Sequence, residues 1–553
     1  MYYYITRIAI IIVSVCAFFL LTAGVGDSVQ RMLRGHDLLS NIYQQIIGEY
    51  VEEVEPDDLL EAAVSGMLSE LDPYGEFIKE RANSEVDVLA HGVYNGLGIK
   101  VKQRNGQHIV SYVYDDIRPL TSLRIGDVLL RIEDTDLRES AITDLRPLLR
   151  GMPGSNVHLL VRRPGSDDSL KLYVLRRAVS VDPLPYQAEL EEGIFYMKLT
   201  RFTKSAADSL RLALQRAYAL RQPKGIILDL RDNPGGLLES AVALVDYFVP
   251  VGTPIVSMQG RQASYTRRYA ARIKPVSEDV PIAVLINGRS ASASEIAAGA
   301  LQDLDRAVII GERTFGKGLV QTLIPLNYNA FLKLTTSRYY IPSGRCIQRL
   351  NYANNGKPET RDEKNAVFKT LRLSRSVRES NGIFPDILIT QDSLPPFLAY
   401  LRTKDAVFDF VVWYCNAHHP DIAPSIDERI RLLFQAHVDT LGFTEDYPLG
   451  EALRTLKREA DRAGAERSML RRIGQIEMDI TRHTARKFDL YWDQIRSLLE
   501  EEFVFQLQNN KMRIARMLRN DDAVRRAVEV LESKASWEAA LLQTASAMQS
   551  LDE

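Results

Sequence analysis

The chain has 553 residues, of which 46% are hydrophobic and 25% are charged, so it is long enough for three or four globular domains. Its formal net charge of −3 gives no basic surface overall, which argues against nucleic acid as a partner. The three cysteines, Cys16, Cys346 and Cys415, form no CxxC pair, so neither a disulfide framework nor a structural zinc site is predicted.

The N-terminal segment is typical of an exported protein. Arg7 precedes an apolar run over residues 8–25, whose length lies between that of a signal peptide and that of a membrane-spanning helix. No clear A-x-A cleavage site follows the run. We therefore assign residues 1–26 to a leader that is either a signal peptide or an uncleaved anchor, with a buried core helix as the remaining alternative.

An N-terminal helical region is predicted over residues 27–83. Apolar residues recur at helical spacing from 38 to 47 and again from 59 to 68. Pro56 separates the two segments and is followed by Asp57 and Asp58, which favour the first turn of a new helix. A turn is expected at residues 71–75.

Residues 84–178 have the character of a small β-rich module. Short strands are predicted at residues 98–101, 108–113, 127–132 and 157–161, with one helix at 142–149.

Residues 179–390 alternate buried strands with helices, which predicts an α/β core. Strands are expected at 225–230, 281–286 and 307–310, and helices at 237–248 and 291–301. Residues 391–553 form a C-terminal region that is largely helical and contains all three tryptophans, Trp413, Trp492 and Trp537.

Ser292 is a candidate nucleophile. It follows a predicted buried strand and the turn at Gly288, and it opens a helix of small residues, where the helix dipole favours negative charge. The alternative is structural, because Ser292 and Glu295 have the spacing of a capping box.

Lys317 is a candidate base, because residues 179–390 contain no histidine. A serine hydrolase built from this segment needs another proton acceptor, and burial lowers the pKa of a lysine enough for it to serve. Gly316 and Gly318 flank Lys317 and allow it to pack closely against another backbone. A solvated loop lysine is one alternative.

A phosphate-binding loop is the other alternative for Lys317. Gly311, Gly316 and Lys317 have the P-loop spacing, but Gly318 stands where the loop needs Ser or Thr. Residues 319–326 moreover favour a strand over the helix that would hold phosphate, so this alternative is set aside.

Residues 229–236 leave a predicted strand and enter a helix through Gly235 and Gly236. Consecutive glycines can present N–H groups in a concave turn, which is what an oxyanion hole requires. The alternative is a plain strand-to-helix turn.

Taken together, residues 35–390 resemble the carboxyl-terminal processing proteases, also called tail-specific proteases. The family's motifs occur in order along the chain: Gly66-Met67-Leu68, Leu71-Asp72-Pro73-Tyr74, Asp229-Leu230-Arg231, Asn233-Pro234-Gly235-Gly236, Ser290-Ala291-Ser292-Ala293-Ser294-Glu295, Gly316-Lys317-Gly318 with Gln321, Arg338-Tyr339-Tyr340-x-Pro342-Ser343-Gly344-Arg345, and Gly382-Ile383-x-Pro385-Asp386.

This resemblance implies a catalytic role for each of several residues. Ser292 would be the nucleophile, Lys317 the general base, and Gln321 the residue that orients the lysine. The backbone N–H groups of Gly236 and Ala293 would form the oxyanion hole. Such a serine endopeptidase needs no metal or cofactor.

The resemblance also implies an architecture. The core at 179–390 would have the ClpP/crotonase-like spiral fold, and residues 84–178 would be an inserted PDZ domain between flanking helical regions. Gly96-Leu97-Gly98-Ile99 would bind the terminal carboxylate of protein or peptide substrates with free C-termini. The family further suggests export to the bacterial periplasm or cell envelope, with membrane anchoring through residues 8–25 and a homo-oligomer both open.

The chain departs from the family at three places. Asp232 stands where glycine is common, Cys346 stands where serine is usual, and residues 121–127 lack the small Ala-Gly pair before the leucine. The last change affects the expected shape of the peptide groove.

Two other functions compete with the protease. A catalytically silent peptide-binding scaffold is disfavoured by the intact Ser292, Lys317 and Gln321. An acyl-CoA enzyme on a related spiral fold is disfavoured by the PDZ-like insertion, because such a module binds peptide termini.

Overall fold

The computed structural model describes residues 29–79, 88–89, 91–138, 140–166, 168–328, 330–354, 357–360, 367–378, 381–390, 395–441 and 448–549. The chain divides into two compact units. The first comprises residues 1–79, 321–335 and 352–359, and the second comprises residues 80–320, 336–351 and 360–553.

The first unit contains the predicted helical pair. Residues 29–49 are helical, and α2 spans Pro56–Ser69. Pro56 occupies the first helical position, where its missing N–H costs no bond, and Asp57 and Asp58 follow it in the first turn. Strand β1 (Glu76–Ile78) pairs antiparallel with the first residues of β18 (Phe331–Tyr340).

A six-stranded sheet forms the centre of the second unit. Its order is β10 (Tyr186–Glu191), β11 (Ile194–Lys198), β12 (Gly225–Asp229), β15 (Ile282–Ile286), β16 (Val308–Gly311) and β23 (Ile387–Leu388). All neighbours from β11 onward are parallel, and β10 is antiparallel to β11. Every residue of β12, β15 and β16 is buried, as a parallel sheet covered on both faces requires. The predicted α/β alternation is therefore confirmed.

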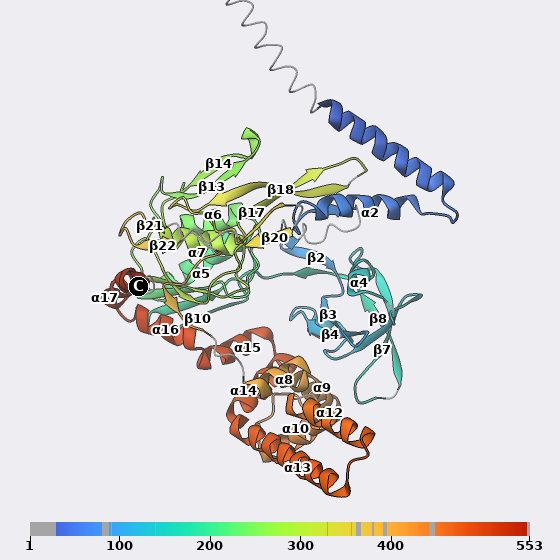
Figure 1. Cartoon of the computed structure of the whole chain (residues 1–553). Coiled ribbons are helices and arrows are strands. Elements are labelled where there is room, and N and C mark those ends of the chain that lie inside the picture. The colour runs from blue at the N-terminus through green and yellow to red at the C-terminus, as the bar shows by residue number, and fades with distance from the viewer. Residues whose placement is uncertain are drawn as a thin grey trace, which may run out of the picture. The chain divides into compact units, whose positions relative to one another are not determined.

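Helices cover both faces of this sheet. One face packs against α5 (Ala206–Leu220), α6 (Leu238–Asp246) and α7 (Ala293–Asp303). The other face packs against α16 (Asp522–Leu531) and α17 (Lys534–Gln549) in a second buried cluster (Figure 1). The Trp537 indole N–H donates to the carbonyl oxygen of Ile282 at 2.9 Å. The last helices of the chain thus complete the α/β layers, although the sequence placed them in a separate C-terminal region.

A further sheet borders the segment that carries Lys317. Strand β13 (Pro254–Gly260) pairs antiparallel with β14 (Arg267–Ala270) and with residues 337–340 of β18. Strand β17 (Leu319–Pro325) also pairs with β18, which confirms the strand expected at 319–326. Short strands complete the fold: β19 (Leu350–Asn354), β20 (Lys357–Thr360), β21 (Val367–Lys369) and β22 (Ser376–Arg378).

The β-rich module has the predicted strands and its own core. Its sheet runs in the order β3 (Ile99–Arg104), β4 (Gln107–Val113), β5 (Val128–Ile132), β7 (Asn156–Arg162) and β8 (Ser169–Leu175), with β6 (Thr135–Asp136) beside β5. Helix α4 spans Ile142–Leu149, and β2 (Val93–Gly96) pairs with β9 (Arg177–Ser180). A cluster that includes Val110, Ile132 and Val157 fills the interior. Strand β3 lies at an edge of the sheet.

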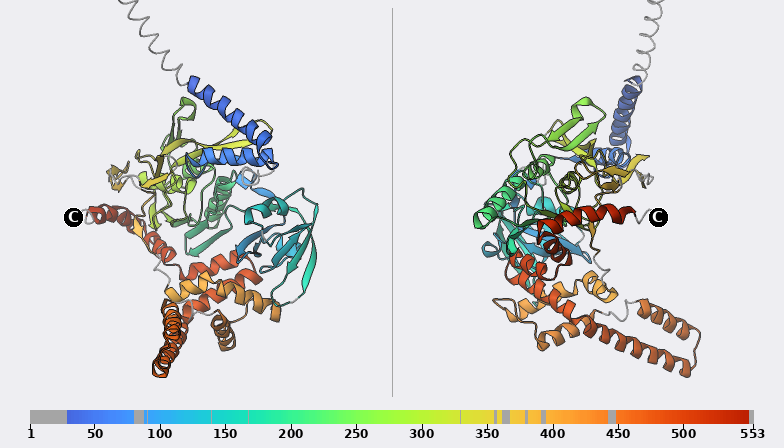
Figure 2. Two further views of the ribbon diagram at one scale, coloured as in Figure 1. Left: turned by 45° about the vertical axis from the view of Figure 1, so that its right-hand side comes forward. Right: turned by 90° about the vertical axis from the view of Figure 1, so that its left-hand side faces the viewer.

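The remaining helices belong to the C-terminal region. They are α8 (Pro396–Thr403), α9 (Ala406–His418), α10 (Glu428–Thr440), α12 (Pro448–Arg462), α13 (Arg467–Leu490), α14 (Trp492–Leu507) and α15 (Asn510–Met517). Phe410, Phe434 and Phe503 lie in a core formed by α8, α9, α10, α14 and the end of α13. Helices α12 and α13 run side by side as a hairpin with a small cluster of their own (Figure 2). Across the described ranges, no helix is both long and apolar enough to cross a membrane. The predicted leader, residues 1–26, lies outside them.

We predict that Leu541→Ala lowers the free energy of unfolding by about 2 to 5 kcal/mol, because it leaves a cavity between α17 and the sheet. Leu541 is completely buried, whereas its neighbour Leu542 is 57% exposed. Leu542→Ala is therefore the matched control and should change the stability by less than about 1 kcal/mol. Urea denaturation followed by tryptophan fluorescence measures both. Equal effects of the two variants would show that α17 does not cover the sheet.

Candidate active site

Ser292 lies at the start of α7 with an unusual backbone conformation. Its φ is 55°, in the left-handed region that residues with a side chain seldom adopt. Such strain persists only where the surrounding structure enforces it, and it is concentrated at functional sites. The side chain is half-buried, in contrast with those of the two flanking serines.

Ser290 and Ser294 are both completely buried and hold the turn together. The Ser290 hydroxyl donates to the carbonyl oxygen of Leu230 at 2.8 Å, and the Ser294 hydroxyl donates to that of Asn233 at 2.9 Å. These two serines therefore have structural partners in the loop that follows β12. Ser292 is the member of the trio that is partly exposed.

Glu295 joins the Ser292 turn to the Lys317 loop. One oxygen of its completely buried carboxylate, Oε2, accepts the backbone N–H of Ser292 at 2.7 Å and that of Lys317 at 2.9 Å. The other oxygen, Oε1, accepts the Gly316 N–H at 2.7 Å and the Thr314 hydroxyl at 2.6 Å. Burial raises the pKa of Glu295, and the four hydrogen bonds oppose that rise. The predicted cap is thus also the link between the two candidate catalytic segments.

The Lys317 loop is fixed by close backbone contacts. Gly316 has a φ of 89°, and a Cβ there would lie 2.6 Å from the Cβ of Arg349. A Cβ on Gly318 would lie 2.7 Å from the backbone nitrogen of Gln348. The carbonyl oxygen of Lys317 accepts a hydrogen bond from the Tyr339 hydroxyl, and the Lys317 side chain is half-buried. The two glycines therefore permit the close approach that the sequence predicted.

The loop after β12 is anchored by a buried ion pair. Asp229 is completely buried and accepts hydrogen bonds from the Tyr196 hydroxyl at 2.5 Å and from the Arg231 guanidinium at 2.7 Å. Arg231 also pairs at 2.7 Å with Asp521, which caps the N-terminus of α16. Burial alone would raise the pKa of Asp229, but the charges of Arg231 and Lys198 hold it well below its usual range.

Gly235 and Gly236 allow this loop to pack closely against its neighbours, including the Ser292 turn. Gly235 has a φ of 98°, and a Cβ there would lie 2.9 Å from the Cβ of Ser292. Gly236 has a φ of 147°, and its Cβ would lie 2.2 Å from the carbonyl oxygen of Phe202. The N–H groups of Gly235 and Ala291 bond to Asn233. Within the part of the chain that the structure describes, the hydrogen bonds of this turn do not use the N–H of Gly236 or of Ala293.

The surroundings of Asp232 account for its presence at a position where the family commonly has glycine. Its φ is 64°, a conformation that glycine adopts freely and that aspartate tolerates better than most residues. Its carboxylate accepts hydrogen bonds from the Asn287 amide at 2.8 Å and from Arg289 at 2.7 Å. Local partners thus hold a backbone conformation for which glycine is commonly used.

Gln321 lies on β17, and its side-chain amide donates to the Thr335 hydroxyl of β18 at 3.3 Å. Both residues belong to the first compact unit, whereas Ser292 and Lys317 belong to the second. The contacts described above join Ser292, Lys317 and the Gly235–Gly236 loop. The role of Gln321 stays a prediction.

The predicted carboxylate-binding loop, residues 96–99, is tightly packed. Gly98 has a φ of 68°, and a Cβ there would lie 2.4 Å from a side-chain carbon of Ile117. Leu97 and Ile99 are buried in the core of the module, and the loop leads directly into the edge strand β3.

The sequence did not reveal the structural roles of Glu295, Thr314 or Asp521. Glu295 stood out only through its spacing from Ser292, because the other groups that it binds lie 19 to 22 residues further along the chain. Asp521 lies in a region that carried no recognised motif.

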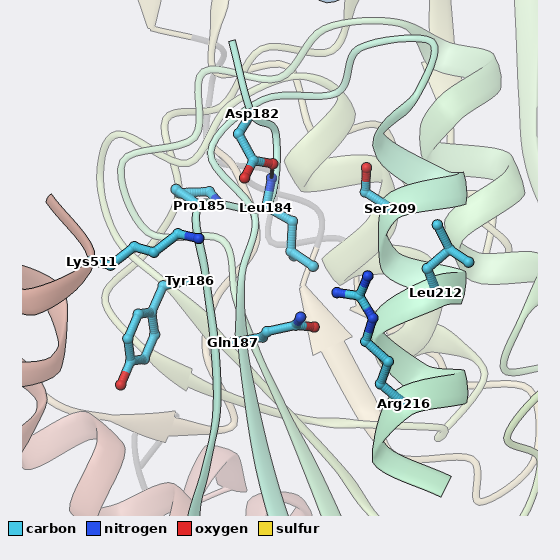
Figure 3. Close-up of a pocket in the computed structure, with 9 residues that line it drawn as sticks. All are labelled: Asp182, Leu184, Pro185, Tyr186, Gln187, Ser209, Leu212, Arg216 and Lys511. Carbon is cyan, nitrogen blue, oxygen red and sulfur yellow. Dashed lines mark hydrogen bonds between the residues drawn. The ribbon is translucent and has the colours of Figure 1, made fainter. Parts of the chain in front are cut away.

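The structure also has a cavity of about 370 Å³ away from these residues (Figure 3). Its lining comes from residues 182–187, which lead into β10, and from α5 and α15, and it includes Leu184, Tyr186, Arg216 and Lys511. None of the predicted catalytic residues lines it. In the same described ranges, no group of His, Cys, Asp and Glu side chains is arranged to hold a metal ion.

Comparison with known proteins relates most of the chain to proteases. A family model described as "Peptidase family S41" matches residues 193–354. Models described as "Probable PDZ-protease, C-terminal helical domain" and "Activating protease CtpB N-terminal domain" match residues 397–531 and 26–82.

Individual relatives agree with these matches. The chain is 37% identical over 312 residues to a carboxy-terminal-processing protease of Bartonella bacilliformis, which covers 56% of this chain and 71% of the relative. It is 28% identical over 343 residues to the carboxy-terminal processing protease CtpA of Bacillus subtilis, covering 62% and 71%. Among solved structures, the photosystem II D1 C-terminal processing protease aligns with 23% identity and a TM-score of 0.37, covering 64% of this chain and 86% of that one.

We predict that Glu295→Gln lowers the free energy of unfolding by about 2 kcal/mol or more. The amide group keeps one acceptor oxygen but turns an NH₂ toward buried donors, so some of the four hydrogen bonds must break. Urea denaturation measures the change. Glu191→Gln, an exposed substitution at the end of β10, is the control and should leave stability nearly unchanged. A Glu295→Gln protein as stable as the control would contradict the bridging role.

We predict a pH-dependent loss of stability in Asp229→Asn. The folded state depresses the pKa of Asp229, so the carboxylate stabilises the fold above its unfolded value of about 3.9, and this stabilisation is lost as the pH falls further. The variant should be less stable by about 3 kcal/mol near neutral pH, since Arg231 loses its buried partner. The difference in the free energy of unfolding between the variant and the wild type should become smaller below about pH 4.

The measurement is urea denaturation at several pH values, with Asp208→Asn on the exposed side of α5 as the control. If Asp229→Asn differs from the wild type in free energy of unfolding by the same amount at neutral and acidic pH, the conclusion that Asp229 is ionised in the folded protein is wrong.

Proposed function

Because this chain belongs to peptidase family S41, with the carboxy-terminal-processing proteases, we propose that its serine-type peptidase activity resides in a Ser292–Lys317 dyad. The observation that carries the proposal is the shared oxygen of Glu295, which accepts the backbone N–H groups of Ser292 and Lys317 together. The burial of Ser290 and Ser294 supports the choice of Ser292 among the three serines.

In the proposed reaction, neutral Lys317 accepts the proton of the Ser292 hydroxyl while the oxygen attacks a peptide carbonyl. The N–H groups of Gly236 and Ala293 stabilise the oxyanion that forms. Lys317 then gives its proton to the leaving amine, and an acyl-enzyme remains on Ser292. Lys317 next takes a proton from a water molecule as that water attacks the ester, and the Lys317 ammonium returns the proton to the Ser292 oxygen as the carboxylic acid product leaves. Gln321 would orient the Lys317 ammonium or amine by accepting a hydrogen bond from it.

The β-rich module is proposed to act as a PDZ domain that recognises substrate tails. The loop at residues 96–99 would bind the terminal carboxylate, and the substrate would add a strand beside β3. The position of β3 at the edge of its sheet supports this proposal. We also propose a ClpP/crotonase-like spiral for the core and, from the predicted leader, export to the cell envelope, where substrates would be cut near their C-termini.

We predict that Ser292→Ala and Lys317→Ala each lower kcat/KM by about 10⁴-fold or more, because loss of either group removes the covalent route. Ser290→Ala and Ser294→Ala are matched controls on the same turn. They remove structural hydrogen bonds and should keep measurable cleavage. The assay is hydrolysis of a fluorogenic peptide with a free C-terminus, and circular dichroism verifies folding. Full activity in Ser292→Ala would eliminate Ser292 as the nucleophile.

A further inference from the structure

One face of the edge strand β3 carries a row of cations. Lys100, Lys102 and Arg104 occupy alternate positions, so their side chains lie on the same face of the sheet. Ile99 and Val101 lie on the opposite face and pack into the core of the module. The strand is therefore apolar toward its own core and basic on its other face.

Two members of this row already bind carboxylates. Lys102 pairs with Asp405 at 2.7 Å, and Arg104 pairs with Asp405 at 3.0 Å and with Asp409 at 2.8 Å. The Lys102 ammonium also lies 3.7 Å from the ring centroid of Phe408. Acidic side chains from the start of α9 thus show the chemistry that this face accepts.

Lys100 is the first cation of the row and directly follows the loop at residues 96–99. Its ammonium nitrogen lies 5.1 Å from the ring centroid of Tyr112 and 5.9 Å from that of Tyr114. Desolvation lowers the pKa of Lys100, and the positive charge of Arg201 lowers it further. Within the described residues, the ion pairs of β3 are those of Lys102 and Arg104. A carboxylate beside Lys100 would favour the charged form of its ammonium group.

Charges of both signs act on the ring of Tyr114, which lies beside Lys100. Burial raises the pKa of Tyr114, whereas the positive charges of Arg201 and Arg150 lower it, so both guanidinium groups act on this ring. Asp116 acts in the opposite direction.

The geometry of an added strand fixes which substrate residue meets Lys100. This step rests on the proposed tail recognition. If the terminal side chain lies on the apolar face with Leu97 and Ile99, the penultimate side chain lies on the face of Lys100, because successive side chains alternate. We propose that Lys100 selects substrates with an Asp or Glu at the penultimate position of the C-terminus.

The test measures binding to the full-length Ser292→Ala protein, which retains the site without cleaving the ligand. Fluorescent peptides of about ten residues carry Asp, Asn or Lys at the penultimate position, and fluorescence anisotropy gives each Kd. The Asp peptide should bind about two to five times more tightly than the Asn peptide, the range expected for a partly exposed ion pair. Adding Lys100→Gln should abolish this difference, and Lys100→Glu should reverse it in favour of the Lys peptide.

Lys171→Gln is the matched control, since Lys171 lies on β8 at the far edge of the same sheet, and it should keep the preference for Asp. Equal Kd values for the Asp and Asn peptides, or a preference that survives Lys100→Gln, would overturn the assignment.

Peptides with an amidated C-terminus test the recognition of the tail separately from the role of Lys100. Equal binding of free and amidated tails contradicts the proposed recognition of the carboxylate. Tighter binding of free tails without an advantage for Asp overturns the role of Lys100 alone.

Discussion

The rest of the candidate site depends on the hydrogen bonds that the buried carboxylate of Glu295 accepts. A buried charge is tolerated only when hydrogen bonds replace the water that it has lost, and Glu295 obtains four of them from the Ser292 turn and the loop over residues 314–317. Neither segment can shift without leaving that charge unsatisfied. The strained φ of Ser292 is held by the same constraint.

A second buried carboxylate extends this support to distant parts of the chain. Asp229 fixes Arg231 at the exit of β12, and Arg231 reaches Asp521 at the start of α16. The loop that places Gly235 and Gly236 against Ser292 is therefore connected to a helix from the far end of the sequence. The geometry of the candidate site relies on charged contacts between remote segments as well as on the packing of the central sheet.

Strands and helices with a regular apolar pattern could be predicted from the sequence, whereas contacts between segments distant in the chain could not. Buried parallel strands such as β12 and β15 are continuous apolar runs, so they were found without difficulty, and the bounds of α4 agreed residue for residue. The glycines that flank Lys317 were also interpreted correctly, because only glycine permits the observed contacts. The bridging by Glu295 was not predictable, since a local spacing cannot show bonds to residues beyond its own turn. The packing of α16 and α17 on the sheet was missed because an apolar helix face does not specify its partner.

The position of α16 and α17 in the chain has a consequence for the order of folding. During synthesis, the strands of the sheet and both Ser292 and Lys317 are made before residues 522–541 exist. Until then one face of the sheet lacks Trp537 and Leu541, and Arg231 lacks Asp521. Chain elongation therefore delays completion of the peptidase core, so a nascent chain carries its candidate catalytic residues before the helical layer that packs on the sheet has been made.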